Sequence, residues 1–189
     1  TTLPVGGADL DGVFTLRTID DAEAIRAKMN ADATVLVIGA GWIGLEVAVA
    51  ARKQGATAIV VELADRVCAR ALTPDMSQWI HDLHVRNGVD IRCSVSFDHF
   101  EGNGQVERAV MADGSTIDCD IAVVGIGLTP NVELAQAAGL EIDNGIVVDE
   151  RGQTSHPDIY AAGAPDPLQS SFIHGVKHLD ARFTPVRPG

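Results

Sequence analysis

Residues 34–62 read TVLVIGAGWIGLEVAVAARKQGATAIVVE and decide the fold of this chain. The run TVLVI at 34–38 is apolar and largely β-branched, as a parallel strand buried on both faces requires. GAGWIG follows directly, and the Ala-, Leu- and Val-rich residues 41–54 predict a helix that Gly55 ends. AIVV at 58–61 predicts a second buried strand, so the stretch is predicted to fold as a βαβ unit.

The glycine-rich turn inside this unit predicts a dinucleotide-binding site. Gly39 permits the tight turn, Gly41 lets the backbone approach a pyrophosphate, and Gly44 lets the helix pack closely on the strand. Trp42 and Ile43 complete the motif at the start of the helix, where N–H groups and the positive dipole end would hold the pyrophosphate. GxGxxG alone is a weak signal, but its place between a predicted strand and a predicted helix strengthens it.

An acid follows the second predicted strand at the spacing that this class of site requires. Glu62 lies 18 residues beyond Gly44, where a carboxylate hydrogen-bonds the ribose hydroxyls and repels a 2′-phosphate, which favours NAD over NADP. Arg66 is near enough to keep NADP as an alternative, because arginine accommodates that phosphate. The ribose of FAD would use the same acid, so the motif alone does not separate NAD from FAD.

The flanking sequence extends the unit into a Rossmann-type parallel sheet of α/β class. Residues 20–29 and 74–87 have the amphipathic spacing of helices, and 89–93 and 121–127 are strand-like. Residues 97–120 alternate polar and apolar positions around the turn signals GNG and DGS, which predicts a small antiparallel β-meander.

The domain organisation follows from where these patterns change. Beyond residue 130 we expect a helix at 132–138 and short strands at 145–148 and 159–162. The predicted segments are a lead-in with its helix (1–30), an NAD-binding domain (31–130), an incomplete piece of a second, FAD-binding domain (131–163) and an irregular tail (164–189).

Composition excludes several other classes of protein. The formal charge of −12, with 14 Lys and Arg against 26 acidic residues, argues against a nucleic-acid surface. No stretch approaches a membrane span and no secretory signal is readable, so the cytoplasm is the expected location. Cys68, Cys93 and Cys119 have no CxxC spacing, which predicts reduced, structural thiols and no metal site.

Two stretches of the sequence resemble a known family. They are GAGWIGLEVAVAARKQGATAIVVELADRV and VVGIGLTPNVELAQAAGLEIDNGIVVDERGQTSHPDIYAAG. Between Gly12 and Gly163 the chain resembles the pyridine-nucleotide half of the two-dinucleotide flavoprotein reductases. Within these it is most similar to the ferredoxin reductases of bacterial Rieske oxygenase and cytochrome P450 systems. The resemblance implies that the glycine-rich turn binds NAD(H) and not FAD.

The resemblance also implies roles for three residues outside the glycines. Trp42 matches an aromatic residue that stacks near the flavin until nicotinamide displaces it, although an ordinary packed indole is the alternative. Glu46 matches an acid near the nicotinamide carboxamide, although an acid in the first turn of a helix is also simply stabilising. Gly127 matches a loop that passes close to the nicotinamide ring.

The activity that the resemblance implies is hydride transfer from NADH to FAD, followed by single-electron transfer to a [2Fe-2S] ferredoxin. The cofactors carry that chemistry, so no catalytic side chain is expected in this chain. In the family an earlier segment holds the FAD pyrophosphate, and an Asp stands where this chain has Ala164. We therefore expect an incomplete FAD site and a chain inactive by itself. The alternatives are an NAD-binding module without turnover and a fragment of a thiol-disulfide or NADH oxidase flavoprotein.

Overall fold

The computed structural model describes residues 5–127, 130–161, 166–167 and 176–178. The chain divides into two units, Thr1–Gly127 and Leu128–Gly189. None of the helices in the described ranges is both long and apolar enough to cross a membrane.

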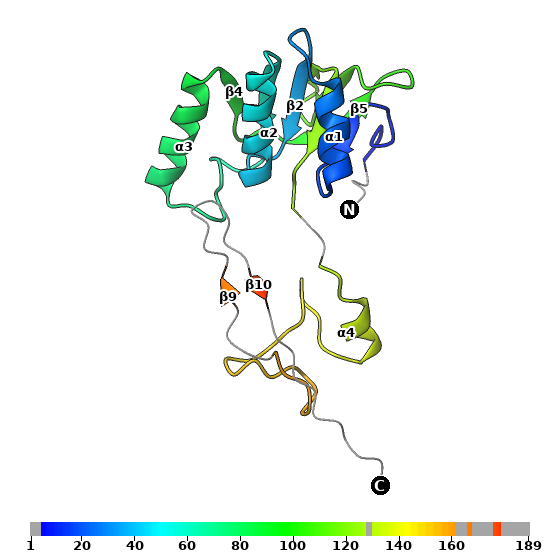
Figure 1. The fold of residues 1–189 in the computed structure, drawn as a ribbon, viewed down its shortest axis with the longest axis vertical. Coiled ribbons are helices and arrows are strands. Elements are labelled where there is room, and N and C mark those ends of the chain that lie inside the picture. The colour runs from blue at the N-terminus through cyan, green and yellow to red at the C-terminus, as the bar shows by residue number, and fades with distance from the viewer. Residues whose placement is uncertain (1–4, 128–129, 162–165, 168–175, 179–189) are drawn as a thin grey trace. The chain divides into compact units, whose positions relative to one another are not determined.

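A five-stranded sheet forms the centre of the first unit (Figure 1). All of its neighbouring strands run parallel, and Val37 lies opposite Val60 on one side and Val123 on the other. In spatial order the strands are β1 (Val13–Thr15), β8 (Ile121–Val124), β2 (Thr34–Ile38), β3 (Thr57–Val61) and β4 (Val89–Arg92). The predicted α/β class with a parallel Rossmann-type sheet is confirmed.

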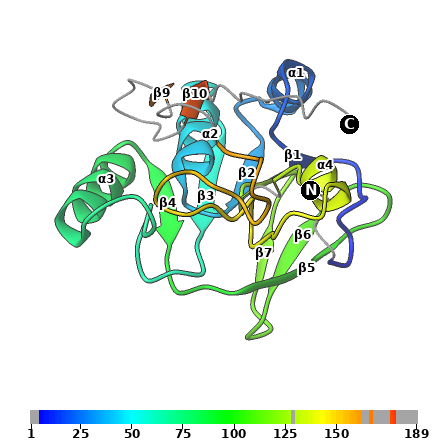
Figure 2. The same ribbon diagram turned by 90° about the horizontal axis from the view of Figure 1, so that it is seen from below.

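The two faces of this sheet are covered by different kinds of structure, which Figure 2 shows. Alternate residues of β2 point to opposite faces, so Val35 and Val37 enter one core cluster and Leu36 the other. The first cluster includes residues of the helices α1 (Ile19–Lys28), α2 (Trp42–Lys53) and α3 (Pro74–Arg86). The second is closed by the meander of β5 (Phe97–Glu101), β6 (Arg108–Met111) and β7 (Thr116–Asp118). The meander expected over 97–120 is therefore present.

The helix expected within the predicted lead-in segment is present, and the segment packs as part of the first unit. It supplies an edge strand, because β1 pairs with β8 and places Val13 opposite Ala122. It also supplies α1, whose Ile25 is buried in the core and whose start is capped reciprocally by Thr18 and Asp21. Residues 5–30 thus belong to the same unit as the glycine-rich turn.

The second unit contains less regular structure than the sequence suggests. The expected helix is present as α4 (Glu133–Ala137). The strand expected at 145–148 is wrong: Ile146 makes only an isolated bridge with Ile142. In the strand expected at 159–162, Tyr160 makes only an isolated bridge with Gln153, and residue 162 is not described.

The tail expected to be irregular lies mostly outside the described residues, as does Ala164. Within it two short strands, β9 (Asp166–Pro167) and β10 (Val176–His178), pair in antiparallel fashion. The assignment of 131–163 to part of an FAD domain stays a prediction.

Candidate nucleotide-binding site

Two glycine turns meet where strands β2 and β8 end. Gly39 directly follows β2, and Gly125 directly follows β8 and donates its N–H to the carbonyl of Ile38 at 2.8 Å. From β2 the sheet continues through β3 and β4 on one side, whereas β8 and β1 lie on the other. Open α/β sheets bind ligands at such a reversal, beyond the carboxyl ends of the strands. The predicted motif therefore lies where this fold binds ligands.

Steric reasons account for two of the three motif glycines. Gly39 has φ +104°, and a Cβ added there would lie 2.7 Å from the carbonyl oxygen of Gly125. At Gly44 an added Cβ would overlap the carbonyl oxygen of Gly39 and approach Val37 Cγ1 to 3.0 Å. These two glycines let the β2 turn, the β8 turn and helix α2 approach one another closely.

The middle glycine of the motif has a different environment. Gly41 has φ −75°, which any residue adopts, and a Cβ added there would meet nothing within 4 Å. It is the N-cap of α2, a helix with no side-chain cap and no acidic residue in its first turn. Open space in front of uncapped helix N–H groups fits a dinucleotide pyrophosphate, because those groups and the helix dipole favour an anion.

Glu62 reaches the glycine-rich turn directly. Its Oε2 accepts a hydrogen bond from the N–H of Ala40 at 2.6 Å, and its Oε1 accepts one from the N–H of Ala64 at 2.8 Å. The carboxylate is half-buried and lies between the end of β3 and the turn after β2. A ribose joined to a pyrophosphate at this turn would be within reach of such a carboxylate.

Arg66 is engaged within its own segment. Its Nη2 donates to the carbonyls of Ala69 at 2.9 Å and Leu72 at 3.4 Å, and its Nη1 lies 3.4 Å from Asp65 Oδ1. The guanidinium of Arg66 is therefore bonded mainly to backbone carbonyls of the loop that follows it.

The remaining predicted site residues lie around the same turns. Trp42 is half-buried against the core, and Ile43 is 50% exposed at the start of α2. Glu46 is exposed and lies beyond the first turn of α2, so the alternative of a stabilising first-turn acid is wrong. Its place near the nicotinamide carboxamide stays a prediction. Gly127 follows β8 with φ +115° and open space around its α-carbon.

The sequence did not predict that Cys68 contacts the glycine-rich turn. The N–H of Cys68 donates to the carbonyl of Ala40 at 2.9 Å, and its thiol donates to the same oxygen at 3.5 Å. The residue has φ +47°. No local sequence signal identifies a contact between residues 28 positions apart.

All three cysteines are free, and their environments raise their pKa values. Burial, followed by the nearby Glu62, raises the pKa of Cys68 to about 11. Burial, followed by Asp120 and Asp118, raises the pKa of Cys119 to about 12. Both thiols therefore stay protonated in the folded protein at pH values where an unfolded thiol ionises.

A pH dependence of stability follows from these thiols. The pKa values of these thiols are higher in the folded state than the ordinary 9.0. Their contribution to the free energy of unfolding is therefore fully present below pH 9 and is lost as pH rises toward 11 to 12. We expect urea unfolding to give a free energy that falls from pH 9 upward. A Cys119→Val variant should show a shallower fall, and an identical slope in both proteins would contradict the assignment.

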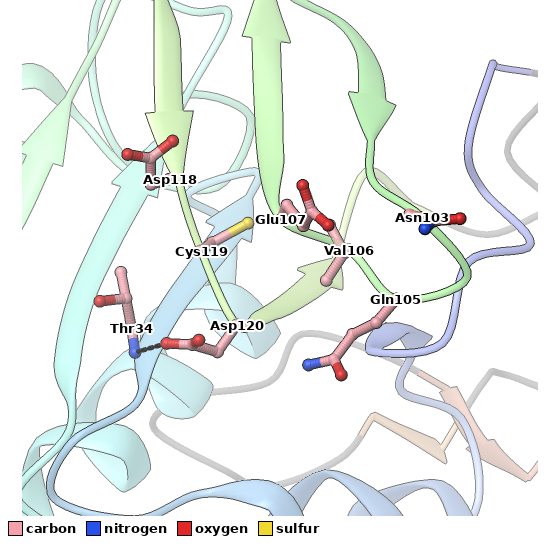
Figure 3. A pocket seen from close by; sticks show the side chains of 8 residues that line it. All are labelled: Thr34, Asn103, Gln105, Val106, Glu107, Asp118, Cys119 and Asp120. Carbon is pink, nitrogen blue, oxygen red and sulfur yellow. Dashed lines mark hydrogen bonds between the residues drawn. The ribbon is translucent and has the colours of Figure 1, made fainter.

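A cavity of about 470 Å³ lies elsewhere in the first unit (Figure 3). It is at the opposite end of the sheet, because Thr34 begins β2 and Asp120 directly precedes β8. Carboxylates and no basic side chains line it, which does not suit a pyrophosphate. The lining residues are Thr34, Asn103, Gln105, Val106, Glu107, Asp118, Cys119 and Asp120.

Fold and turn geometry together define a Rossmann-type α/β domain with a glycine-rich turn, and comparison with known proteins identifies its family. Residues 1–168 match the family model described as pyridine nucleotide-disulphide oxidoreductase, and the chain belongs to that family. The resemblance predicted from the sequence is confirmed. In the described part of the chain, no group of three or more His, Cys, Asp or Glu side chains could hold a metal ion.

Three relatives show which members of the family the chain is similar to. Rhodocoxin reductase of Rhodococcus erythropolis is 46% identical over 162 residues, covering 85% of this chain and 38% of that protein. The ferredoxin–NAD(+) reductase subunit of the benzene 1,2-dioxygenase system of Pseudomonas putida is 38% identical over 170 residues, covering 89% and 42%. The solved ferredoxin reductase for the CYP199A2 system from Rhodopseudomonas palustris has TM-score 0.76 and 45% identity, covering 82% and 39%. The chain spans about two fifths of the length of these relatives.

Proposed function

We propose that the first unit is the NAD(H)-binding part of a flavoprotein reductase that passes electrons from NADH through FAD to a [2Fe-2S] ferredoxin. The observation that supports nucleotide binding is the open space at Gly41, in front of the uncapped start of α2. The electron-transfer part is supported by relatives named as reductases of ferredoxin in oxygenase and P450 systems.

In the proposed site, residues at and near the two glycine turns bind different parts of the dinucleotide. The N-terminus of α2 at Gly41 holds the pyrophosphate, and Glu62 accepts hydrogen bonds from the adenosine ribose. In this proposal Trp42 and Gly127 contact the nicotinamide end of the dinucleotide, where it meets the flavin. NADH supplies the hydride when it is bound, and the residues of this chain bind and orient it.

The nucleotide site is expected to bind NADH at least about 10-fold more tightly than NADPH, a difference of about 1.4 kcal/mol. The Glu62 carboxylate would repel a 2′-phosphate, and Arg66 is held by the carbonyls of Ala69 and Leu72. Isothermal titration of the 189-residue chain with each nucleotide measures the ratio. Equal affinities would contradict the assignment of Glu62, and binding of neither would contradict the proposed site.

A further inference from the structure

The peptide groups on both sides of Ala40 are held in place by hydrogen bonds from outside the turn. The residue is 0% exposed. Its N–H donates to Glu62 Oε2 at 2.6 Å, and its carbonyl accepts from the N–H of Cys68 at 2.9 Å. Both partners belong to the segment 62–68 that follows β3. The backbone of the turn between β2 and α2 is therefore fixed at its second residue by bonds to the protein itself.

The segment that holds Ala40 is itself anchored in the core. The carbonyl of Val67 accepts a hydrogen bond from Ser77 Oγ of helix α3 at 2.5 Å, and both residues are 0% exposed. Glu62 also accepts from the N–H of Ala64 at 2.8 Å, which limits the positions that its carboxylate can take. The hydrogen bonds to Ala40 thus connect the glycine-rich turn to a rigid part of the fold.

We propose that Glu62 is a positioning residue, which with Cys68 sets the GxGxxG turn in its binding geometry before nucleotide arrives. This role goes beyond ribose recognition, and only its effect on affinity rests on the proposed function. A carboxylate has two oxygens with about four acceptor sites. The bonds to Ala40 and Ala64 use one site on each oxygen, which leaves acceptor capacity for ribose hydroxyls.

The chemistry of the side chain makes the role specific to a carboxylate. In a Glu62→Gln variant one of the two oxygens becomes an NH₂ group, which cannot accept from a backbone N–H. Either Ala40 or Ala64 then loses its partner, and a charge-assisted bond to the other becomes an ordinary one. The Ala40 N–H is therefore held less strongly in either orientation of the amide. The neighbouring Asp65→Asn provides a control of equal charge change, because the Asp65 side chain is 80% exposed and forms an ion pair with Arg66 at 3.4 Å.

Amide hydrogen exchange of the nucleotide-free chain, measured residue by residue by NMR, tests the proposal. In the unmodified chain the Ala40 N–H should exchange as slowly as core amides of β2. In Glu62→Gln it should exchange at least 10-fold faster while the amide of Val37 changes less than 2-fold, and Asp65→Asn should leave both unchanged. A merely structural role would accelerate both amides together and would overturn the proposal.

A second measurement separates this inference from the proposed function. NADH affinity should fall at least 10-fold in Glu62→Gln and stay unchanged in Asp65→Asn. Lost affinity with unchanged exchange at Ala40 would overturn positioning and leave Glu62 as a ribose ligand only. Fast exchange at Ala40 in the unmodified chain would overturn the proposal even if the variant did not fold. Slow exchange there and its acceleration in Glu62→Gln, without NADH binding by any chain, would support positioning and overturn the proposed function.

Discussion

Gly44→Ala should lower the free energy of unfolding by about 3 kcal/mol, at the upper end of what an added methyl group costs in a packed site. The new Cβ would overlap the carbonyl oxygen of Gly39 and lie 3.0 Å from Val37 Cγ1. The Gly39 carbonyl belongs to the backbone, and the N–H of Gly39 is bonded to the carbonyl of Val61 at 2.8 Å. Relief therefore requires helix α2 to move away from β2.

Gly41→Ala is the matched control for this substitution. It adds the same atom three residues earlier, where nothing lies within 4 Å and φ is −75°. Urea unfolding of the two variants should show a large loss for Gly44→Ala and a change below about 1 kcal/mol for Gly41→Ala. Equal losses would mean that the close approach of α2 and β2 does not limit stability.

Gly41→Val should weaken NADH binding on the order of 100-fold, which is about 2.7 kcal/mol of binding free energy. The branched side chain would fill the space in front of the first turn of α2 where the pyrophosphate is proposed to lie. The folded state should persist, because a Cβ added at Gly41 would meet nothing within 4 Å and no side-chain cap is lost. Isothermal titration measures the affinity, and thermal unfolding by circular dichroism checks the fold.

Thr73→Val controls for valine at a helix N-cap. Thr73 is the exposed N-cap of α3 and makes no side-chain capping bond, so its replacement changes the same kind of position away from the proposed site. It should leave NADH affinity within 2-fold of the unmodified chain. Unchanged NADH affinity in a folded Gly41→Val protein would place the dinucleotide elsewhere.

Much of the central architecture can be read from local sequence. The strand expected at 34–38 has those bounds in β2, because a continuous apolar run is the pattern of a strand buried on both faces. The helix expected at 41–54 matches α2 within one residue at each end. The spacing from Gly44 to Glu62 also placed an acid beside the glycine-rich turn, since one helix and one strand of ordinary length separate them.

Contacts between segments that are distant in the sequence could not be predicted from local sequence patterns. The three residues of β1 form a strand because β8, more than 100 positions away, offers its edge to them. One face of the sheet is covered by a meander and not by helices, which depends on how β5 to β7 pack on Leu36 and Val61. Periodicity reports which residues are apolar, but not which partner covers them.

In the candidate site, too, some features follow from the sequence and others only from the tertiary structure. By itself the sequence determined the βαβ unit, the three glycines and the acid, because each depends on spacing along one short stretch. Only the tertiary structure showed that Glu62 and Cys68 hold the Ala40 peptide and that Arg66 is occupied by backbone carbonyls. Those interactions depend on the path of the loop after β3, which is set by its packing on α3 and on the turn after β2.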